Sequence, residues 1–350
     1  MSEATARAFP NIALVKYWGK RDEELILPVA GSLSLTLDSF GTTTTVSADP
    51  SLAADEFELG GAHQHGAGLA RVGAFLDLVR ARAGSTTYAK VTSVNEAPTG
   101  AGLASSAAGF AALATAASAV YGLPTDGPAL SRLARRGSGS AARSIVPRTA
   151  IWHAGTGDAT SFAEPVDAPE MAMVIVTVDQ SAKEVSSREA MRRTAATSPY
   201  FRPWCTSTEE SLREMVAACR AGDFTRIGQI TESHALRMHA VIAGCEPPIR
   251  YLRPASIAVF DAVADLRGRG VEAYATADAG PNVAVLVQPG QAETVAAELN
   301  GVAGSAQVRV VGAGPGAHLV SDTCPDTRAQ TPPHSRSGTR SHAQPSEAGA

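Results

Sequence analysis

Residues 98–109 combine glycines, hydroxyl side chains and the start of a helix, which together suit phosphate binding. The run is Pro98-Thr99-Gly100-Ala101-Gly102-Leu103-Ala104-Ser105-Ser106-Ala107-Ala108-Gly109. A strand is predicted just before it and an alanine-rich helix just after it, while its proline and glycines prevent the loop from continuing either element. Unpaired amides and the positive end of the helix then face one point, with three hydroxyls beside it. The spacing matches neither the P-loop nor the dinucleotide-binding fingerprint. By itself the loop is equally compatible with a small-residue helix packed tightly on a sheet.

Two lysines lie four residues apart in a chain that otherwise prefers arginine. The chain has 30 Lys and Arg residues, of which four are lysines (Lys16, Lys20, Lys90 and Lys183), so 26 are arginines. Lys16 and Lys20 therefore mark positions where a compact ammonium is required. Without further information, surface lysines on an edge strand explain the same spacing.

Three further segments carry chemistry-bearing side chains. A Ser/Gly loop over 137–144 contains Arg143, two serines precede Arg188 at a predicted helix start, and Asp278 opens an Asp-Ala-Gly-Pro-Asn turn. By residue type alone these segments are equally a flexible connection, a helix cap and a turn.

The histidines and cysteines predict no metal site. His63 and His65 lie in a Gly/Ala-rich loop without further ligands nearby, so we expect a solvated loop and no bound metal. His234 and His239 are five residues apart on a predicted helix and do not share a face well, so we interpret them as structural.

Five motifs together resemble the GHMP kinase superfamily and, within it, the diphosphomevalonate decarboxylases. The resemblance extends from about residue 7 to about residue 322. The motifs are Asn-Ile-Ala-x-x-Lys-Tyr-Trp-Gly-Lys at 11–20, the glycine-rich loop at 98–109, Gly-Ser-Gly-Ser-Ala-x-Arg-Ser at 137–144, Ser-Ser-Arg at 186–188 and Asp-Ala-Gly-Pro-Asn at 278–282.

The resemblance implies a role for each matching residue. Asp278 is the catalytic carboxylate facing the substrate's 3-hydroxyl, and Arg143 and Lys16 fix the substrate carboxylate. The implied diphosphate ligands are Tyr17, Lys20, Ser187 and Arg188. The implied ATP-binding residues are Gly100, Gly102, Leu103, Ala104, Ser105 and Ser106.

The implied reaction is ATP-dependent decarboxylation of (R)-5-diphosphomevalonate to isopentenyl diphosphate, ADP, phosphate and CO2, through transient 3-phosphorylation. ATP and Mg2+ are the implied cofactors. The implied fold is α+β with two GHMP-kinase-like domains: an ATP-binding domain over 7–178, similar to domain 2 of ribosomal protein S5, and a ferredoxin-like α/β sandwich over 179–322. Relatives are commonly dimers, so a homodimer is implied.

Two segments depart from the family pattern. Pro147 and Arg148 replace a pair of glycines, and Ala30 and Gly31 stand where relatives usually carry hydroxyl or amide residues. A decarboxylase or kinase for a different 3-hydroxy acid is therefore an alternative. A nucleotide-binding protein that has lost catalysis is a further one, against which the joint presence of Asp278, Arg143 and Lys16 speaks.

The elements that position these residues follow from periodicity. Residues 1–8 are expected to be loose, and 33–37 with 42–46 to form a hairpin. Strands are expected at 11–20, 89–94, 171–178 and 307–311, and on both sides of the turn at 278–282. Helices are expected at 69–82, 110–117, 127–136, 185–191, 209–220, 224–240, 256–270 and 291–299.

Composition narrows the function classes. A net charge of −4, no dense basic run and 5% aromatic residues argue against a nucleic-acid binder. No signal peptide or membrane-spanning stretch is expected, and four widely spaced cysteines indicate free thiols, so we expect a cytoplasmic protein with a small-molecule substrate. Residues 323–350 lose all periodicity and are expected to form a disordered tail.

Overall fold

The structure is a computed structural model that describes residues 2–96, 105–179, 181, 183–304 and 307–320. The tail predicted over 323–350 lies outside these residues. The strands are β1 (Ser2–Ala8), β2 (Asn11–Val15), β3 (Lys20–Asp22), β4 (Leu27–Pro28), β5 (Ser32–Thr36), β6 (Thr42–Ala48), β7 (Glu56–Leu59), β8 (Ala62–His63), β9 (Ala89–Asn95), β10 (Thr149–Trp152), β11 (Ala163–Pro165), β12 (Ala172–Thr177), β13 (Ala273–Thr276), β14 (Val283–Val287), β15 (Gln307–Gly312) and β16 (His318–Leu319). The α-helices are α1 (Ala67–Ala83), α2 (Ser105–Tyr121), α3 (Gly127–Gly137), α4 (Ala141–Ser144), α5 (Ser187–Thr197), α6 (Phe201–Ala221), α7 (Phe224–Ala243), α8 (Pro254–Gly268) and α9 (Ala292–Leu299).

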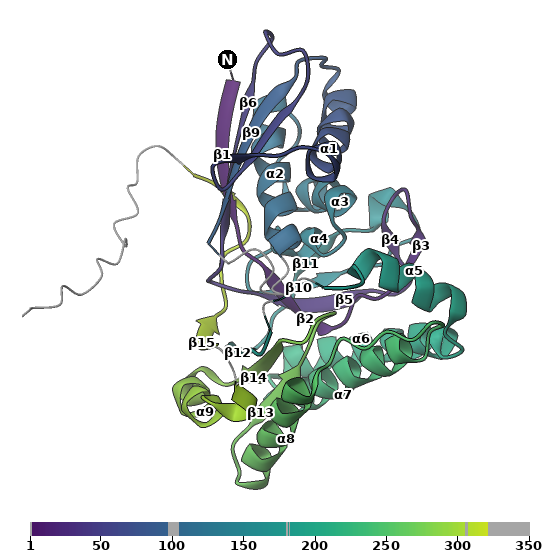
Figure 1. Cartoon of the computed structure of the whole chain (residues 1–350), viewed down its shortest axis with the longest axis vertical. Coiled ribbons are helices and arrows are strands. Elements are labelled where there is room, and N and C mark those ends of the chain that lie inside the picture. The colour runs from purple at the N-terminus through teal and green to yellow at the C-terminus, as the bar shows by residue number, and fades with distance from the viewer. Residues whose placement is uncertain (1, 97–104, 180, 182, 305–306, 321–350) are drawn as a thin grey trace, which may run out of the picture. The chain divides into compact units, whose positions relative to one another are not determined.

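The first sheet has the strand order β16-β1-β6-β9-β7-β8, and α2 packs on β1 and β6 (Figure 1). The looseness predicted for residues 1–8 is wrong for residues 2–8, because β1 pairs with β6 from Ser2 to Ala8. Its buried side chains are the alanines Ala6 and Ala8, which fit beneath the alanine-rich α2. Since alanine is small, the alternation that marks a strand is weak in this segment.

The predicted hairpin over 33–46 is also wrong. Both segments are strands, but β5 pairs with β2 and β10 in a second sheet of order β11-β10-β5-β2, whereas β6 pairs with β1 and β9. The connecting turn therefore carries the chain from one sheet to the other.

The third sheet has the order β13-β14-β12-β15 and is buried on both faces. Along β12, Val174 and Val176 face a core with α8 and α9, while Met173 and Ile175 face a core shared with β2, β5, α6 and α7. Burial on both sides explains the uninterrupted apolar run of this strand.

Helix α7 lies between the third sheet and β2, and it contacts both β13 and β2. The ends of β2 and β13 are thereby brought together, although Val15 and Thr276 are far apart in the sequence. Residues 1–320 form one compact unit by their contacts, and the predicted domain boundary after residue 178 stays a prediction.

Candidate active site

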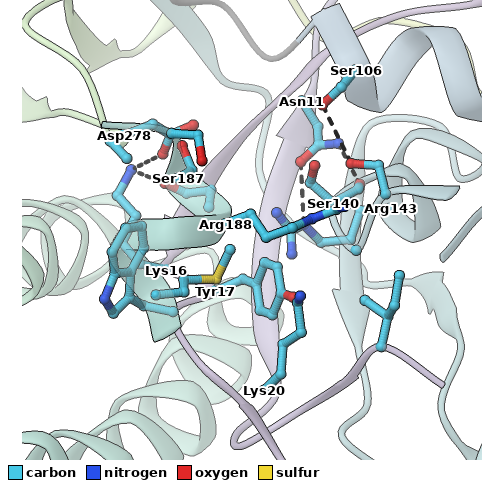
Figure 2. A pocket seen from close by; sticks show the side chains of 18 of the residues that line it. Asn11, Lys16, Tyr17, Lys20, Ser106, Ser140, Arg143, Ser187, Arg188 and Asp278 are labelled. Atoms are coloured by element: carbon cyan, nitrogen blue, oxygen red, sulfur yellow. Dashed lines mark hydrogen bonds and ion pairs between the residues drawn. The ribbon is translucent and has the colours of Figure 1, made fainter. Parts of the chain in front are cut away.

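A cavity of ≈ 520 Å³ opens where the ends of β2 and β13 meet the α3–α4 loop, α4 and the start of α5 (Figure 2). Among the described residues, those predicted to act on the substrate all line it, together with one predicted ATP ligand. They are Lys16, Tyr17, Lys20, Ser106, Arg143, Ser187, Arg188 and Asp278.

Lys16 and Asp278 form an ion pair at one end of this cavity. The Lys16 Nζ donates to Asp278 Oδ1 at 2.7 Å and to the Ala13 carbonyl at 2.7 Å, next to a register shift in β2. The Lys16 side chain is 1% exposed, and that of Asp278 is 34% exposed. The carboxylate therefore faces the open cavity while the lysine holds it from behind.

The two pKa values reflect burial and mutual attraction. Burial lowers the pKa of Lys16 even though Asp278 opposes that change. Burial alone would raise the pKa of Asp278, but the charges of Lys16, Arg143 and Lys183 and the Lys16 hydrogen bond hold it below its usual value. Asp278 is therefore ionised at pH 7 and can accept a hydrogen bond from a hydroxyl group.

Arg143 is a buried cation beside this pair. Its Nε donates to Asn11 Oδ1 at 3.2 Å and its Nη1 to Ser32 Oγ at 2.5 Å, and burial lowers its pKa to about 10. Asn11 in turn donates to Ser144 Oγ and the Ser140 carbonyl. Among the described residues no carboxylate pairs with Arg143, so its charge is available to an anion in the cavity.

Tyr17 and Lys20 lie on another side of the cavity (Figure 2). The Tyr17 hydroxyl is buried and has no hydrogen-bond partner among the described residues, and burial raises its pKa. The Lys20 Nζ contacts Glu23 Oε2 at 2.5 Å. An unpartnered hydroxyl beside an ammonium suits an oxyanion.

The start of α5 closes the cavity. Ser186 caps the helix by accepting a hydrogen bond from the Glu189 amide at 3.2 Å, as its N-cap position predicts. Ser187 and Arg188 follow in the first turn and line the cavity, and the Arg188 side chain extends toward Arg143 (Figure 2). The positive helix end adds to the attraction for an anion.

Two cations were not predicted from the sequence. Arg71 of α1 donates to the Gly137 carbonyl at 2.8 Å, and burial together with Arg188 lowers its pKa to about 10. Lys183 lines the cavity near Asp278, and burial lowers its pKa. The scarcity of lysine could have identified Lys183. The chain has four lysines, and three of them line this cavity.

A second cavity of ≈ 200 Å³ shares Arg71 and Ser106 with the first. Its walls come from β6, β7, β9, α1 and α2, and they combine the rings of Phe57 and Phe110 with the polar side chain of Asn95. Of the predicted ATP ligands, Gly100, Gly102, Leu103 and Ala104 lie outside the described residues. Ser105 is the first residue of α2.

The two departures from the family pattern lie away from the larger cavity. Arg148 forms an ion pair with Glu170, with the two side chains 50% and 65% exposed. A Cβ on Gly31 would come within 2.9 Å of the Trp152 carbonyl oxygen in the backbone, so packing favours the glycine, and neither it nor Ala30 lines the cavity. The substitutions that motivated a different substrate therefore do not contact the site.

Two further features are absent from the described residues. No group of three or more His, Cys, Asp or Glu residues is placed to hold a metal ion there. None of the described helices is long and apolar enough to cross a membrane.

Comparisons with known proteins identify relatives over nearly the whole described chain. Residues 8–163 match the family described as "Diphosphomevalonate decarboxylase-like N-terminal domain", and residues 173–320 match "Mevalonate 5-diphosphate decarboxylase C-terminal domain". The chain is 39% identical to a diphosphomevalonate decarboxylase of Aspergillus fumigatus over 86% of this chain and 80% of that one. It is 36% identical to the human diphosphomevalonate decarboxylase over 86% and 81%.

Solved structures give the same relationship. A structure described as "MDDEF in complex with MVAPP, AMPPCP and Magnesium" is 45% identical, with a TM-score of 0.87, covering 91% of this chain and 99% of that one. A mevalonate diphosphate decarboxylase from Staphylococcus aureus is 40% identical, with a TM-score of 0.88 and coverages of 91% and 98%.

Proposed function

The chain belongs to the diphosphomevalonate decarboxylase family, and from that premise we propose how its residues carry out the family reaction. The protein is an ATP- and Mg2+-dependent enzyme that decarboxylates (R)-5-diphosphomevalonate, and its α+β fold is that of GHMP-family decarboxylases. The observation that carries this assignment is the Lys16–Asp278 pair beside Arg143 in a cavity lined by further cations.

The reacting end of the substrate is assigned to Asp278, Lys16 and Arg143. Arg143 has no carboxylate partner among the described residues, which supports its binding the substrate carboxylate. Asp278 is ionised and faces the cavity, which supports its accepting the proton of the 3-hydroxyl or orienting that group. Lys16 fixes the Asp278 carboxylate and adds positive charge near the substrate carboxylate.

The remote diphosphate is assigned to Tyr17, Lys20, Ser187 and Arg188. The buried, unpartnered Tyr17 hydroxyl and the two cations support this assignment, because a diphosphate offers several oxyanion acceptors. Binding energy at this end then positions the reacting end, which is how remote contacts increase rate.

ATP is assigned to the second cavity and to the loop before α2. The aromatic rings of Phe57 and Phe110 and the amide of Asn95 suit a nucleobase, and Arg71 and Ser106 belong to both cavities, on the path from nucleoside to substrate. The predicted ligands at residues 100–106 would bind the phosphates.

The residues present fit a Mg2+ ion that is held mainly by phosphates. The larger cavity has one carboxylate in its described lining, Asp278, and the Ser106 hydroxyl would be a further oxygen ligand for the ion. Mg2+ supplies neutralisation of phosphate charge during transfer.

The reaction then has three steps: phosphoryl transfer, loss of phosphate and loss of CO2. The 3-hydroxyl oxygen bonds to the γ-phosphorus of ATP as the bond to the β-phosphate oxygen breaks, giving ADP and a 3-phosphate, and the hydroxyl proton passes to Asp278 or to solvent. The C3–O bond breaks with loss of phosphate. The electrons of the C–CO2 bond form the alkene, and CO2 and isopentenyl diphosphate leave.

The decisive test is ATP-dependent CO2 release from 5-diphosphomevalonate, with Asp278→Asn as the control. Release by the natural enzyme that the variant lacks supports the proposal. No release despite ATP binding would favour the alternatives, a different 3-hydroxy acid or lost catalysis. Arg148 was the main reason to expect a different 3-hydroxy acid as the substrate, and its exposed position removes that reason.

We also propose that the enzyme is a cytoplasmic homodimer, as the family resemblance implies. Cys205, Cys219 and Cys245 are free thiols, which fits a reducing compartment. Light scattering of the purified protein tests the dimer: a mass of one chain, 35.9 kDa, would contradict it.

A further inference from the structure

Helix α7 contributes two buried histidines that the reaction scheme does not use. His234 and His239 are five residues apart, so their side chains leave the helix in directions that differ by about 140°. This separation argues against a shared ligand, but it allows one helix to reach two different segments. In the structure His234 bonds to the main chain of Lys16, and His239 bonds to the main chain of Ala277, the residue before Asp278.

His234 accepts a hydrogen bond from the Lys16 amide. The distance from Lys16 N to His234 Nδ1 is 3.0 Å. Lys16 directly follows the last residue of β2, so its amide lies beyond the strand and is satisfied by the imidazole. The backbone of Lys16 is therefore held from α7 while its side chain turns toward Asp278.

The second nitrogen of His234 fixes the tautomer that this bond requires. Thr208 Oγ1 donates to the Trp204 carbonyl at 2.8 Å, so at 3.3 Å it accepts from His234 Nε2–H. Nδ1 is then the unprotonated nitrogen. Burial, with the charges of Arg237 and Lys16, lowers the pKa of His234 well below its usual value, which keeps the imidazole neutral.

His239 bonds to the segment on the other side of the ion pair. Its Nε2 lies 3.3 Å from the carbonyl of Ala277, the residue before Asp278, and a carbonyl can only accept, so Nε2 carries the proton. Burial lowers the pKa of His239 to about 4, so it too is neutral at pH 7. Ala277 is the first residue after β13.

We propose that His234 and His239 are positioning residues that together set the spacing of Lys16 and Asp278, one as a hydrogen-bond acceptor and the other as a donor. This inference rests on the proposed function, because it assigns the ion pair to the reacting end. Both residues act through the main chain and do not line the cavity, whereas Met238 between them does.

The test uses amide side chains, because an Asn amide can occupy the place of Nδ1 and a Gln amide that of Nε2. His234→Asn keeps the acceptor for Lys16 and His234→Gln loses it, while His239→Gln keeps the donor for Ala277 and His239→Asn loses it. We expect each matching variant to stay within about 3-fold of the natural kcat and each mismatched one to lose roughly 10-fold or more, with KM little changed. If the histidines merely fill space, positions 234 and 239 should both prefer Asn or both prefer Gln, and that result would overturn the proposal.

Two further measurements separate this inference from the function itself. Thr231→Val, a buried change on the same helix that removes a bond to the Ile227 carbonyl, should leave kcat unchanged. Hydrogen exchange of the peptide containing the Lys16 amide needs no turnover: exchange should be faster in His234→Gln than in His234→Asn, and equal rates would contradict the proposal. An inactive natural enzyme would contradict only the proposed function.

Discussion

At the scale of single residues, the site depends on how Lys16 is kept charged in a buried position. Its Nζ has two acceptors, Asp278 Oδ1 and the Ala13 carbonyl, and its side chain is 1% exposed. A buried ammonium without a counter-ion is costly, whereas replacement of both partners is often neutral. The ion pair therefore links the stability of the fold to the proposed role of Asp278 in the reaction.

Asp278→Asn should destabilise the protein as well as abolish turnover. Removing one partner of a buried ion pair lowers the free energy of unfolding by at least about 3 kcal/mol. We expect this lower value here because the Asp278 side chain is 34% exposed. Without the carboxylate, the pKa of Lys16 falls further in the folded state while the unfolded value is unchanged. Between the two values the unfolded chain binds more protons, so the free energy of unfolding rises with pH.

Urea denaturation at about pH 7 and about pH 9.5 measures this effect, with the smaller deficit expected at the higher pH. The double variant Lys16→Met with Asp278→Asn is the matched control, because it removes the buried charge and should recover stability at both pH values. A deficit in Asp278→Asn that does not change with pH would contradict the argument.

Arg148 is a residue whose replacement should leave function intact. It has a φ of 56°, its amide donates to the Gly314 carbonyl, and its side chain pairs with Glu170 at the surface. Arg148→Gly relieves the left-handed strain and loses a weak surface ion pair, so the free energy of unfolding should stay equal or rise by up to about 1 kcal/mol.

Arg148→Ala is the control, since it loses the ion pair but keeps the strain, and it should be the less stable variant. Steady-state kinetics of both should match the natural enzyme. A changed KM for diphosphomevalonate in Arg148→Gly would instead show that this departure from the family pattern tunes the substrate.

The sequence predicted which residues gather at the site far better than how they are held. Asp278 and Arg143 were identified because their motifs are specific to the family, yet by residue type each was only a turn or loop residue. Arg71 has no motif and lies on an ordinary helix, so only the packing of α1 beside α2 and α3 brings it to the cavity. The support from His234 depends on contacts between residues more than 200 positions apart.

At the scale of elements, the α3–α4 loop packs against the residue that follows Lys16. A Cβ on Gly139 would lie 2.7 Å from Tyr17 Cε1 and 2.8 Å from its hydroxyl oxygen. Gly139→Ala should therefore displace Tyr17 and raise KM for diphosphomevalonate roughly 10-fold, the effect of about 1.5 kcal/mol from one lost hydrogen bond to a charged group. The turnover number should change less, because the Tyr17 hydroxyl makes no hydrogen bond to Lys16 or Asp278 among the described residues.

Gly157→Ala is the matched control, because a Cβ there would meet nothing within 4 Å. Steady-state kinetics over a range of substrate concentrations separate the two constants. A fall in kcat at unchanged KM would place Tyr17 in the chemical step and contradict its assignment to the diphosphate.

Helices were predicted more reliably than strand partners. The start of α5 followed from a local serine cap, whereas the pairing of β5 and β6 followed from sheets that no local pattern encodes. Alternation in 33–37 and 42–46 predicted two strands and a turn correctly, but a turn does not determine whether its strands pair. β1 was missed because its buried face consists of alanines, and its strand is stabilised by distant partners: the neighbouring strands β6 and β16 and the packing of α2.

At the scale of the whole molecule, net charge and local charge have opposite signs. The chain carries −4 overall, yet the larger cavity is lined by six Lys and Arg side chains and one carboxylate among the described residues: Lys16, Lys20, Arg71, Arg143, Lys183, Arg188 and Asp278. A cationic cleft attracts anions at close range whatever the total charge. Composition alone argues against nucleic-acid binding but gives no indication of this cleft.

The cleft predicts that inorganic pyrophosphate alone stabilises the protein. Binding to the folded state should raise the free energy of unfolding by about 2.7 kcal/mol at 100 times Kd, which thermal unfolding with increasing pyrophosphate measures. Arg188→Ala should lose most of this gain. Arg192→Ala should keep it, because Arg192 lies on the same helix but is exposed, pairs with Glu189 and does not line the cavity. Equal stabilisation of the natural enzyme and Arg188→Ala would mean that the anion binds elsewhere, and the assignment of Arg188 to the diphosphate would be wrong.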